Sequence, residues 1–403
     1  LMALNLGASY TLASNIDMSE LKRSSGMWNT STGFVPLGDS TTAFTGTFDG
    51  LGHTIAGLYV NRPATDYVGF FGYTQNSSVI QNVGLIDVDV TGQNYVGGLV
   101  GANDSNGAVS NSYSTGNVTG DSFIGGLVGV SAHGTINNSY STSTVTGNLM
   151  VGGLVGYNYG GSISNSYSTG VVNSSGDYVG SLVGVNKYNG TISNSYSTGS
   201  VSGRNYLGGL VGENGDFSTV SNSYSMAGSV VGTGNNIGGL VGSDSGTIKN
   251  SYYNIDNVLI NGARHVTKGG LYDLQYQDWV NNNYRELNIA NYNTSLAYKS
   301  DGGYYTVTTA QGLKDMLAFL EMGYTFKLGS NIDLGDLPDW HLPVFSGTFD
   351  GSGYTLSNMT VNQSFNDDIG FIGRLNTGTV TGLGLINVSV VGHDSVGALV
   401  GYN

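Results

Sequence analysis

The dominant feature of this chain is a sequence repeat of about 28 residues. In its cleanest copy, Val151-Gly-Gly-Leu-Val-Gly156 is followed by Ser162-Ile-Ser-Asn-Ser-Tyr-Ser-Thr-Gly170. The tyrosine of the second segment recurs with spacings of 27, 27, 29, 28 and 28 residues, at Tyr113, Tyr140, Tyr167, Tyr196, Tyr224 and Tyr252. A fixed period of this length is typical of proteins that stack many small structural units.

The content of each unit predicts an all-β fold, a parallel β-helix (β-solenoid). Short apolar runs such as Gly-Leu-Val are separated by Gly, Ser and Asn turn residues, and no unit holds ten residues of helical periodicity. One unit cannot bury a core, but stacked units can, because equivalent residues lie over one another in successive coils. A propeller fits less well, since a blade needs about 40 residues and four antiparallel strands.

The repeated Asn-Ser-Tyr segment predicts two ladders of identical side chains. The tyrosines form one row, and the other row consists of Asn111, Asn138, Asn165, Asn194, Asn222 and Asn250. We expect the asparagines to face inward, because buried amides can bond to their copies in neighbouring coils. We favour a purely structural role for both rows over the alternative of a ligand-binding face.

Glycine is frequent, with 66 copies in 403 residues, and many sit at fixed places in the unit. We expect recurring corners with positive φ, where glycine carries no steric penalty. The paired glycines Gly97-Gly98, Gly125-Gly126 and Gly152-Gly153 are interpreted as a bulge that re-aims the following leucine. Leu154 is expected to point into the core.

These segments resemble a known motif, the GLUG repeat. GLUG repeats occur in large secreted bacterial proteins, including haemagglutinin-like adhesins exported by two-partner secretion and the region ahead of the catalytic domain in IgA1-type metallopeptidases. The stretch Phe44-Thr-Gly-Thr-Phe-Asp-Gly-Leu-Gly-His-Thr-Ile55 resembles the segment that usually precedes the repeats. The resemblance implies a right-handed β-helix, and the preference of parallel crossovers for a right hand favours the same conclusion.

The repeats divide the chain into a first module and the start of a second. Opening strands over residues 1–67 and GLUG-like coils over 68–253 make up the module 1–253. Residues 254–308 break the period and are expected to form a packed, irregular connection. The opening then recurs over 309–403: Gly347 and Asp350 match Gly46 and Asp49 at an offset of 301 residues. A chain that starts and stops within this pattern is interpreted as part of a longer protein.

One short helix is predicted at residues 309–322, ahead of strands and first coils over 323–403. Its apolar residues Leu313, Met316, Leu317 and Leu320 follow helical spacing. Thr309 is the expected N-cap.

Composition limits the partners and the chemistry. With 13 Lys and Arg against 27 Asp and Glu, the net charge is −14, which disfavours nucleic acid as a partner. No run of 18 apolar residues is present, so we predict no membrane insertion. Cysteine is absent, which excludes disulfides and thiolate chemistry.

The search for catalytic residues finds no constellation, and no catalytic residue, metal site or cofactor is predicted. None of the five histidines stands in a His-Glu-x-x-His motif, so the metallopeptidase activity linked to some GLUG proteins has no matching residues here. The carboxylate pairs Asp87/Asp89 and Asp367/Asp368 could serve acid–base catalysis or bind calcium. We favour a solvated outer face for both pairs.

The resemblance and the two levels of repeat lead to a functional expectation. We expect a non-catalytic structural stalk of a secreted, cell-surface adhesin or extracellular fibre, built from tandem modules and able to self-assemble end to end. Its partners would be other copies or modules of itself, and host or neighbouring-cell glycans or proteins.

Two other functions were weighed. The main alternative is a carbohydrate-binding or carbohydrate-cleaving β-helix, whose groove would lie at a break in the repeat, at residues 18–43 or 254–308. Ice binding by a threonine row is a weaker alternative, because the row of Thr115, Thr142, Thr169 and Thr198 fails at Met226-Ala227.

Overall fold

The computed structural model of the chain describes residues 2–22 and 31–403. Met27 and Trp28, within the predicted irregular stretch 18–43, lie outside the described residues. The chain forms two compact units, each described here by itself: Leu1–Thr233 with Leu240–Ser251 (unit 1), and Gly234–Gly239 with Tyr252–Asn403 (unit 2).

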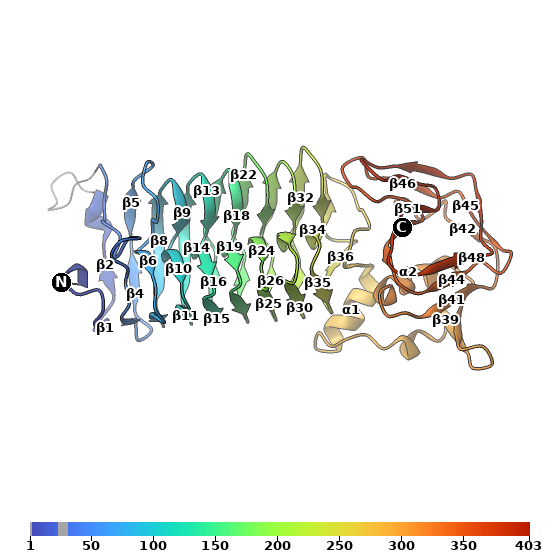
Figure 1. The fold of residues 1–403 in the computed structure, drawn as a ribbon, viewed down its shortest axis with the longest axis horizontal. Coiled ribbons are helices and arrows are strands. Elements are labelled where there is room, and N and C mark those ends of the chain that lie inside the picture. Colours follow the sequence, from blue (N-terminus) through green and yellow to red (C-terminus); the bar gives the residue numbers. More distant parts are fainter. Residues whose placement is uncertain (1, 23–30) are drawn as a thin grey trace. The chain divides into compact units, whose positions relative to one another are not determined.

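Unit 1 is a parallel β-solenoid, as the repeat predicts, and Figure 1 shows its coils side by side. Each regular coil adds one strand to each of several parallel sheets. Sheet A contains β1 (Ser9–Thr11), β3 (Thr47–Asp49), β7 (Val79–Gln81), β11 (Ala108–Ser110), β15 (Thr135–Asn137), β20 (Ser162–Ser164), β25 (Thr191–Ser193), β30 (Thr219–Ser221) and β35 (Thr247–Lys249). Sheet C contains β6 (Phe71–Thr74), β10 (Val100–Asp104), β14 (Val128–Ala132), β19 (Val155–Tyr159), β24 (Val183–Lys187), β29 (Val211–Asn214) and β34 (Val241–Asp244).

Two further sheets complete the coil. Sheet D contains β9 (Asn94–Gly97), β13 (Ser122–Gly125), β18 (Leu149–Gly152), β23 (Val179–Gly180) and β28 (Leu207–Gly208). Sheet B begins with β2 (Ile16–Asp17), β4 (Thr54–Ala56), β5 (Tyr59–Asn61), β8 (Gly84–Thr91) and β12 (Tyr113–Thr119). After β12 the sheet divides into two rows of strands. One row contains β16 (Tyr140–Ser141), β21 (Tyr167–Ser168), β26 (Tyr196–Ser197) and β31 (Tyr224–Ser225). The other row contains β17 (Thr144–Gly147), β22 (Val172–Ser174), β27 (Val201–Gly203) and β32 (Ser229–Gly232). The opening segment also carries the short 3-10 helices η1 (Met2–Leu4) and η2 (Ser19–Lys22).

The strands pair in the register that the repeat predicts. Ile163 lies between Ile136 and Ile192 in sheet A, and Tyr140 lies between Tyr113 and Tyr167 in sheet B. Because parallel strands lie about 4.8 Å apart, each residue meets its own copy in the next coil. The apolar copies fill the interior, and Leu154, Ile163 and Ile136 are all fully buried. The predicted inward position of Leu154 is therefore confirmed.

The paired glycines mark a tight corner rather than a bulge. In one coil, strand β9 of sheet D ends at Gly97, the chain bends at Gly98, and strand β10 of sheet C begins at Val100. A Cβ on Gly97 would lie 2.2 Å from the carbonyl oxygen of Val100, and one on Gly98 would lie 2.2 Å from the Oγ of Ser114. Neither glycine has positive φ, so the repeat needs glycine here for close packing and not for backbone conformation.

A bulge does occur in sheet B, within strand β8. Asp87 has a φ of 53°, and the pairing of β8 with β12 shifts between Ser114 and Gly116. The bulge breaks the alternation of side chains. As a result Val88 is buried while Ile86, which the alternation predicts inside, is only half-buried.

Unit 2 holds the non-repeating segment and a second set of coils. Residues 234–239 and 252–308 contain β33 (Ile237–Gly238), β36 (Tyr252–Asn254), β37 (Leu259–Ile260), β38 (Gly270–Leu271), α1 (Asp273–Asn281), η3 (Ile289–Tyr292), β39 (Leu296–Lys299) and β40 (Tyr304–Val307). The coils that follow contain β41 (Thr325–Leu328), β42 (Ile332–Asp333), β43 (Leu342–Phe345), β44 (Thr348–Asp350), β45 (Thr355–Ser357), β46 (Thr360–Asn362), β47 (Ile372–Leu375), β48 (Thr379–Thr381), β49 (Gly384–Ile386), β50 (Ser389–Val391) and β51 (Val400–Tyr402).

The predicted helix at 309–322 is present but shorter. It runs as α2 (Ala310–Met316) and tightens into η4 (Leu317–Phe319). Thr309 caps it by accepting from the backbone N–H of Gly312, as predicted. Neither α1 nor α2, the helices of the described chain, has the length and apolarity to cross a membrane.

The other helix, α1, was not predicted. Its buried residues are Gln275, Tyr276 and Trp279, and the polar Gln275 obscures the apolar pattern expected of a packed helix. Gln275 is fully buried, and its side chain donates a hydrogen bond to the carboxylate of Asp315 on α2. Beside it, β39 and β40 form an antiparallel hairpin. The segment 254–308 is thus more regular than the sequence indicates.

Candidate functional site

The asparagines of the Asn-Ser-Tyr segments lie at an exposed corner of the coil, which corrects their predicted inward orientation. Each has a left-handed backbone, with φ between 46° and 51°. Asparagine tolerates this conformation better than most residues, so the corner selects it for its backbone and directs its side chain outward. The exposed members are Asn111, Asn138, Asn165, Asn194 and Asn222, and Asn250 is half-buried.

Hydrogen bonds join parts of this corner from coil to coil. The bonds are Asn111 Nδ2 to Asn82 Oδ1 (3.1 Å), Asn165 Nδ2 to Asn137 Oδ1 (2.9 Å) and Asn250 Nδ2 to Asn222 Oδ1 (2.7 Å). The acceptor is sometimes the equivalent asparagine and sometimes the residue before it. The corner is therefore a network of exposed amides rather than one continuous ladder.

The continuous ladder is formed by the serine between Asn and Tyr, which the sequence reasoning missed. Ser112, Ser139 and Ser166 are buried, and the backbone N–H of each donates to the Oγ of the next serine, 3.2 Å away in each case. The row continues through Ser195, Ser223 and Ser251. The signal was in the sequence, since serine follows the asparagine in every one of the six Asn-Ser-Tyr segments.

The tyrosines form a stack of nearly parallel rings. The ring centroids are 4.7 Å apart for Tyr113–Tyr140 and Tyr140–Tyr167, 4.9 Å for Tyr167–Tyr196 and 5.0 Å for Tyr196–Tyr224, with interplanar angles of 2° to 8°. Burial, together with the rings of its two neighbours, raises the pKa of the Tyr140 phenol. Tyr252, in unit 2, differs: it is 8% exposed and meets Trp279 edge-on.

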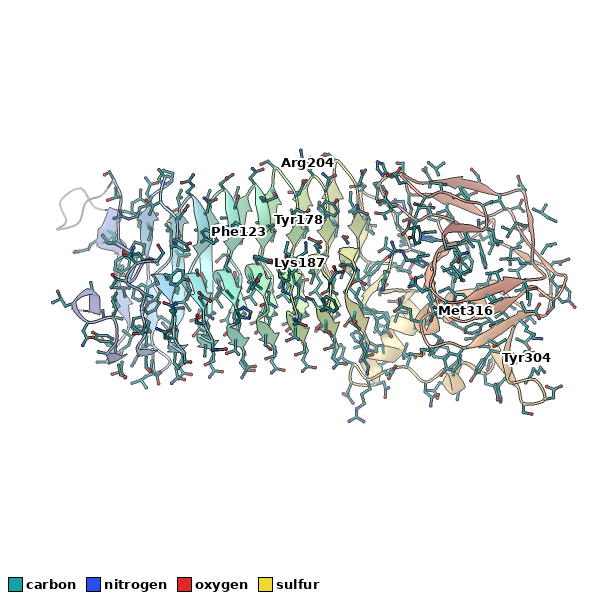
Figure 2. The ribbon with its side chains drawn as sticks, viewed as in Figure 1. Phe123, Tyr178, Lys187, Arg204, Tyr304 and Met316 are labelled. Carbon is teal, nitrogen blue, oxygen red and sulfur yellow. The ribbon has the colours of Figure 1, made fainter. Side chains whose placement is uncertain are left out.

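In five coils an aromatic residue occupies the position before the Val-Gly-Gly segment or its equivalent, and sequence reasoning also missed this row; Met150 interrupts it between Phe123 and Tyr178. Tyr67, Tyr95 and Phe123 stack at 4.6 and 4.8 Å, and Tyr178 stacks on Tyr206 at 4.7 Å. Phe123 and Tyr178 are labelled in Figure 2. All five residues have φ between 58° and 63°, so this corner uses aromatic residues, rather than glycine, in a left-handed conformation. The stacking contacts help to offset the backbone cost.

The interior contains a third row, built from polar side chains on sheet C. Asn158, Asn186 and Asn214 are fully buried, and each of the first two donates from Nδ2 to the Oδ1 of the next, at 2.7 and 2.9 Å. Asn103 and Ser131 occupy the same row in earlier coils. This is the inward amide ladder that we predicted for the other asparagines.

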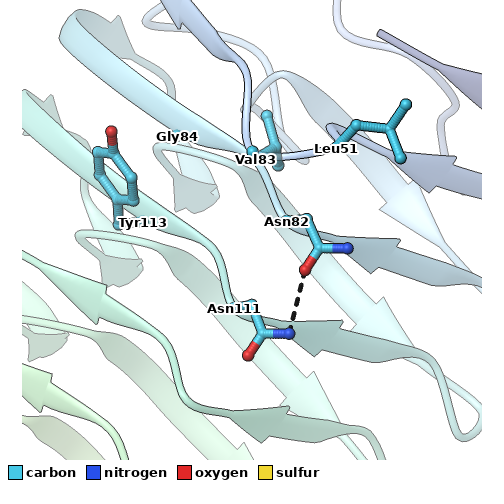
Figure 3. A pocket seen from close by; sticks show the side chains of 7 residues that line it. Leu51, Asn82, Val83, Gly84, Asn111 and Tyr113 are labelled. Atoms are coloured by element: carbon cyan, nitrogen blue, oxygen red, sulfur yellow. Dashed lines mark hydrogen bonds between the residues drawn. The ribbon is translucent and has the colours of Figure 1, made fainter.

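A pocket of about 440 Å³ opens where the tyrosine stack ends. Its walls include Leu51, Asn82, Val83, Gly84, Asn111 and Tyr113, which are shown in Figure 3. Tyr113 is the first ring of the stack because its partner in the preceding coil is Gly84. The pocket thus combines an aromatic side chain with two amides from the exposed corner.

The carboxylate pairs considered from the sequence have other partners. Asp89 pairs with Lys22 at 2.6 Å, while Asp87 lies exposed at the bulge. Asp368 pairs with Arg374 at 2.7 Å, and Asp367 pairs with His393 at 2.7 Å. These contacts are surface ion pairs, which contribute little stability individually.

His393 is also the centre of a small cluster with Asp367 and Asp394, whose potential ligand atoms all lie within 4.8 Å of one another. Such a set can hold a divalent cation in principle. Its members are exposed or half-exposed, and the Nδ1 of His393 is engaged by Asp367. That hydrogen bond raises the pKa of His393, which favours the protonated, non-ligating imidazole.

Comparison with models of known protein families identifies the motif that repeats in this chain. The model of the GLUG motif matches residues 92–119, 147–173 and 175–202. The chain carries GLUG repeats. Each match covers one coil that includes a Val-Gly-Gly or Val-Gly-Ser corner, so the motif corresponds to one turn of the solenoid.

Two curated relatives match this chain over short stretches. Halomucin from Haloquadratum walsbyi is 43% identical over 111 residues, which is 27% of this chain and 1% of that protein. A glycine-rich membrane protein from Evansella cellulosilytica is 32% identical over 74 residues, 18% of this chain and 9% of that protein. The chain therefore spans only a small fraction of the length of either relative.

A solved structure also aligns with this chain. It is a Bacteroides ovatus protein named, provisionally, an immunoglobulin A1 protease. The alignment covers 74% of this chain and 84% of that one, with 21% identity and a TM-score of 0.44.

Proposed function

We propose that this chain is a non-catalytic structural stalk segment of a secreted, cell-surface protein, built from tandem GLUG solenoid modules. The observation that carries the proposal is that unit 2 repeats the coil register of unit 1. In unit 1, Tyr10 pairs with Phe48 and Phe48 with Ile80. In unit 2, Phe326 pairs with Phe349 and Phe349 with Val380.

The same correspondence holds on the other faces of the coil. Ile16 pairs with Ile55 in unit 1, as Ile332 pairs with Leu356 in unit 2. Each coil buries its apolar residues only against its neighbours, so adding modules lengthens a solenoid without needing a new core. A chain that begins the same module twice is suited to spanning distance.

The surface location is supported by the curated relatives. One is named a membrane protein, and the chain matches 9% of it; the match to halomucin covers 1% of that protein. A short repeat segment within much longer proteins fits a stalk that holds other parts away from a cell. The partners we propose are further copies or modules of the same solenoid, which would join end to end.

Immunogold electron microscopy on intact cells of the source organism tests the location. Antibodies raised against this chain should label the cell exterior or material shed from it. Labelling confined to the cytoplasm of sectioned cells would refute the proposal. A reducing-end assay of the purified chain on a panel of polysaccharides tests the absence of catalysis, and turnover that scales with protein concentration would favour the carbohydrate-cleaving alternative.

A further inference from the structure

The N-terminal end of unit 1 leaves a strand edge and several apolar side chains uncovered. β1 is the first strand of sheet A, at the end of the coils (Figure 1), and β3 is its strand partner within the described chain. Beside it Leu4 is 84% exposed, Ile16 is 39% exposed and Tyr10 is half-buried. A free edge flanked by apolar side chains is suited to pairing with a further strand.

Unit 2 begins with an equivalent segment, so the same chain shows what covers such an end. Ser14-Asn15-Ile16-Asp17 recurs as Ser330-Asn331-Ile332-Asp333, at an offset of 316 residues. The local contacts recur as well. Oδ1 of Asn15 accepts from the N–H of Thr54 at 3.0 Å, and the counterpart bond joins Asn331 and Thr355 at 2.9 Å.

The counterparts of the exposed residues are buried in unit 2. Leu320, Phe326 and Ile332 stand where unit 1 has Leu4, Tyr10 and Ile16, and they are 7%, 0% and 4% exposed. Over Phe326 the cover is strand β40, which pairs in parallel with β41 and places Tyr305 in register with Phe326. The two rings lie 6.0 Å apart, centroid to centroid. β40 thus occupies the side of β41 that is open on β1.

The end of β41 also donates two hydrogen bonds to β40 and the residue after it. The N–H of Gly329 donates to the carbonyl oxygen of Val307 at 2.9 Å. The Oγ of Ser330 donates to the carbonyl oxygen of Thr308 at 2.7 Å. Their counterparts in unit 1, which form no hydrogen bond within the described residues, are the N–H of Ala13 and the Oγ of Ser14.

We propose that the N-terminal end of unit 1 binds a parallel β-strand of the β40 type, supplied by the connecting segment of a further GLUG module. The strand would lay an aromatic side chain over Tyr10, and its carbonyl oxygens would accept from Ala13 and Ser14. Main-chain bonds give such strand addition its affinity, and alternate side chains give it selectivity. The inference rests on the proposed stalk and specifies how one module joins the next.

An extended chain tests the fit. A second copy of residues 289–316 is added directly ahead of Leu1, because Leu317, which follows this segment in the chain, is the counterpart of Leu1 at the same offset. Covalent linkage gives the segment a high effective concentration. Hydrogen exchange over residues 9–13, measured by mass spectrometry, should slow about tenfold or more. A free peptide of residues 294–309, at millimolar concentration, provides a second measurement on the unmodified chain.

Two variants of the added segment form a matched pair. Val307→Asp should restore fast exchange, because Val307 pairs with the counterpart of the buried Leu12 and a carboxylate there would lose its solvation. Thr306→Asp should keep the protection, because Thr306 lies on the opposite face of the strand and is half-exposed in unit 2.

Three outcomes would overturn the proposal. The first is unchanged exchange over residues 9–13 both in the extended chain and with the free peptide. The second is protection that Val307→Asp retains. The third is exchange that slows as the unmodified chain is concentrated and gains nothing from the added segment, because the occupant would then be the end of a second copy. None of these would affect the surface location tested by immunogold labelling, and cytoplasmic labelling would refute the stalk without affecting the strand pairing.

Discussion

Asn158 donates from Nδ2 to Oδ1 of Asn186, 2.7 Å away in the next coil, and both side chains are fully buried. Asn186 in turn donates to Asn214 at 2.9 Å and to the carbonyl oxygen of Gly190 at 3.1 Å. A buried amide is costly unless its donors and its acceptor are paired. Three consecutive coils carry the same amide at this position, so Asn158 pairs with Asn186 and Asn186 pairs with Asn214.

Replacing Asn186 with alanine should therefore destabilise the solenoid. The change removes three hydrogen bonds and leaves donors or acceptors on both neighbours unpaired, at a cost of about 2 to 3 kcal/mol. Urea unfolding of unit 1, followed by circular dichroism, measures the loss. The matched control is Asn117→Ala, since Asn117 is an exposed strand residue and its loss should change stability by less than about 0.5 kcal/mol. Equal losses of stability in the two variants would show that the buried asparagine contributes no more to stability than the exposed one.

Ser131 interrupts the same row, and filling its place with asparagine should stabilise the chain. Ser131 pairs in register with Asn103 on one side and Asn158 on the other. The buried Oγ of Ser131 and Oδ1 of Asn158 have no partner in the described chain. In Ser131→Asn, Nδ2 can donate to Oδ1 of Asn158, as Asn158 itself donates to Asn186, with a gain of about 1 kcal/mol.

The control for this change is Ser131→Ala, which removes an unpaired hydroxyl and should be nearly neutral. Thermal unfolding of the three proteins compares them directly. A lower melting temperature for Ser131→Asn than for Ser131→Ala would contradict the prediction, because it would mean that the space cannot take the carboxamide.

The period of the sequence predicted the fold because a solenoid places each residue on its own copy. The stacking of Tyr113 on Tyr140 follows directly from a spacing of 27 residues. Within a coil the same reasoning is weaker, since the period does not say which side chains point inward. The asparagines of Asn-Ser-Tyr were placed inside because identical amides can pair, whereas the backbone at Asn111 is left-handed and turns the side chain to solvent.

The buried amide row was missed because its members vary. The position is held by Asn103, Ser131, Asn158, Asn186 and Asn214 in successive coils, and only three consecutive coils carry asparagine. The pocket at Tyr113 could not be predicted either, because it depends on the absence of a ring at Gly84. An interruption within a repeat becomes visible only once the register of the coils is known.

Leu154→Asp should be strongly destabilising. Leu154 is fully buried behind the corner glycines, where a carboxylate would have no cation to pair with, so we expect a loss of about 4 kcal/mol or more. Val171→Asp provides the comparison, because Val171 is 44% exposed and its charge would be solvated. Differential scanning calorimetry should show a large drop in melting temperature for the first variant and a small one for the second. Similar drops would contradict the coil register.

His341 in unit 2 should make stability depend on pH. Its imidazole is 2% exposed, and burial lowers its pKa from 6.5 to about 4, against the opposing effect of Asp339. The nearby His265 also lowers the pKa of His341. Its own Nδ1 lies 3.3 Å from the Asp339 carboxylate. Because the folded pKa is below the unfolded one, the unfolded chain binds the extra proton between these two values.

Stability of unit 2 should therefore fall as the pH drops from about 6.5 to about 4, by about 3 kcal/mol in total. Above pH 6.5 this contribution should be constant, since both states are then neutral at His341. Urea unfolding across this range, with fluorescence from the buried Trp279 and Trp340, measures the slope. His341→Asn should flatten it, because asparagine does not titrate, and His133→Asn should leave it unchanged, because His133 is exposed in unit 1. A slope that survives in His341→Asn would assign the pH dependence to other groups of unit 2.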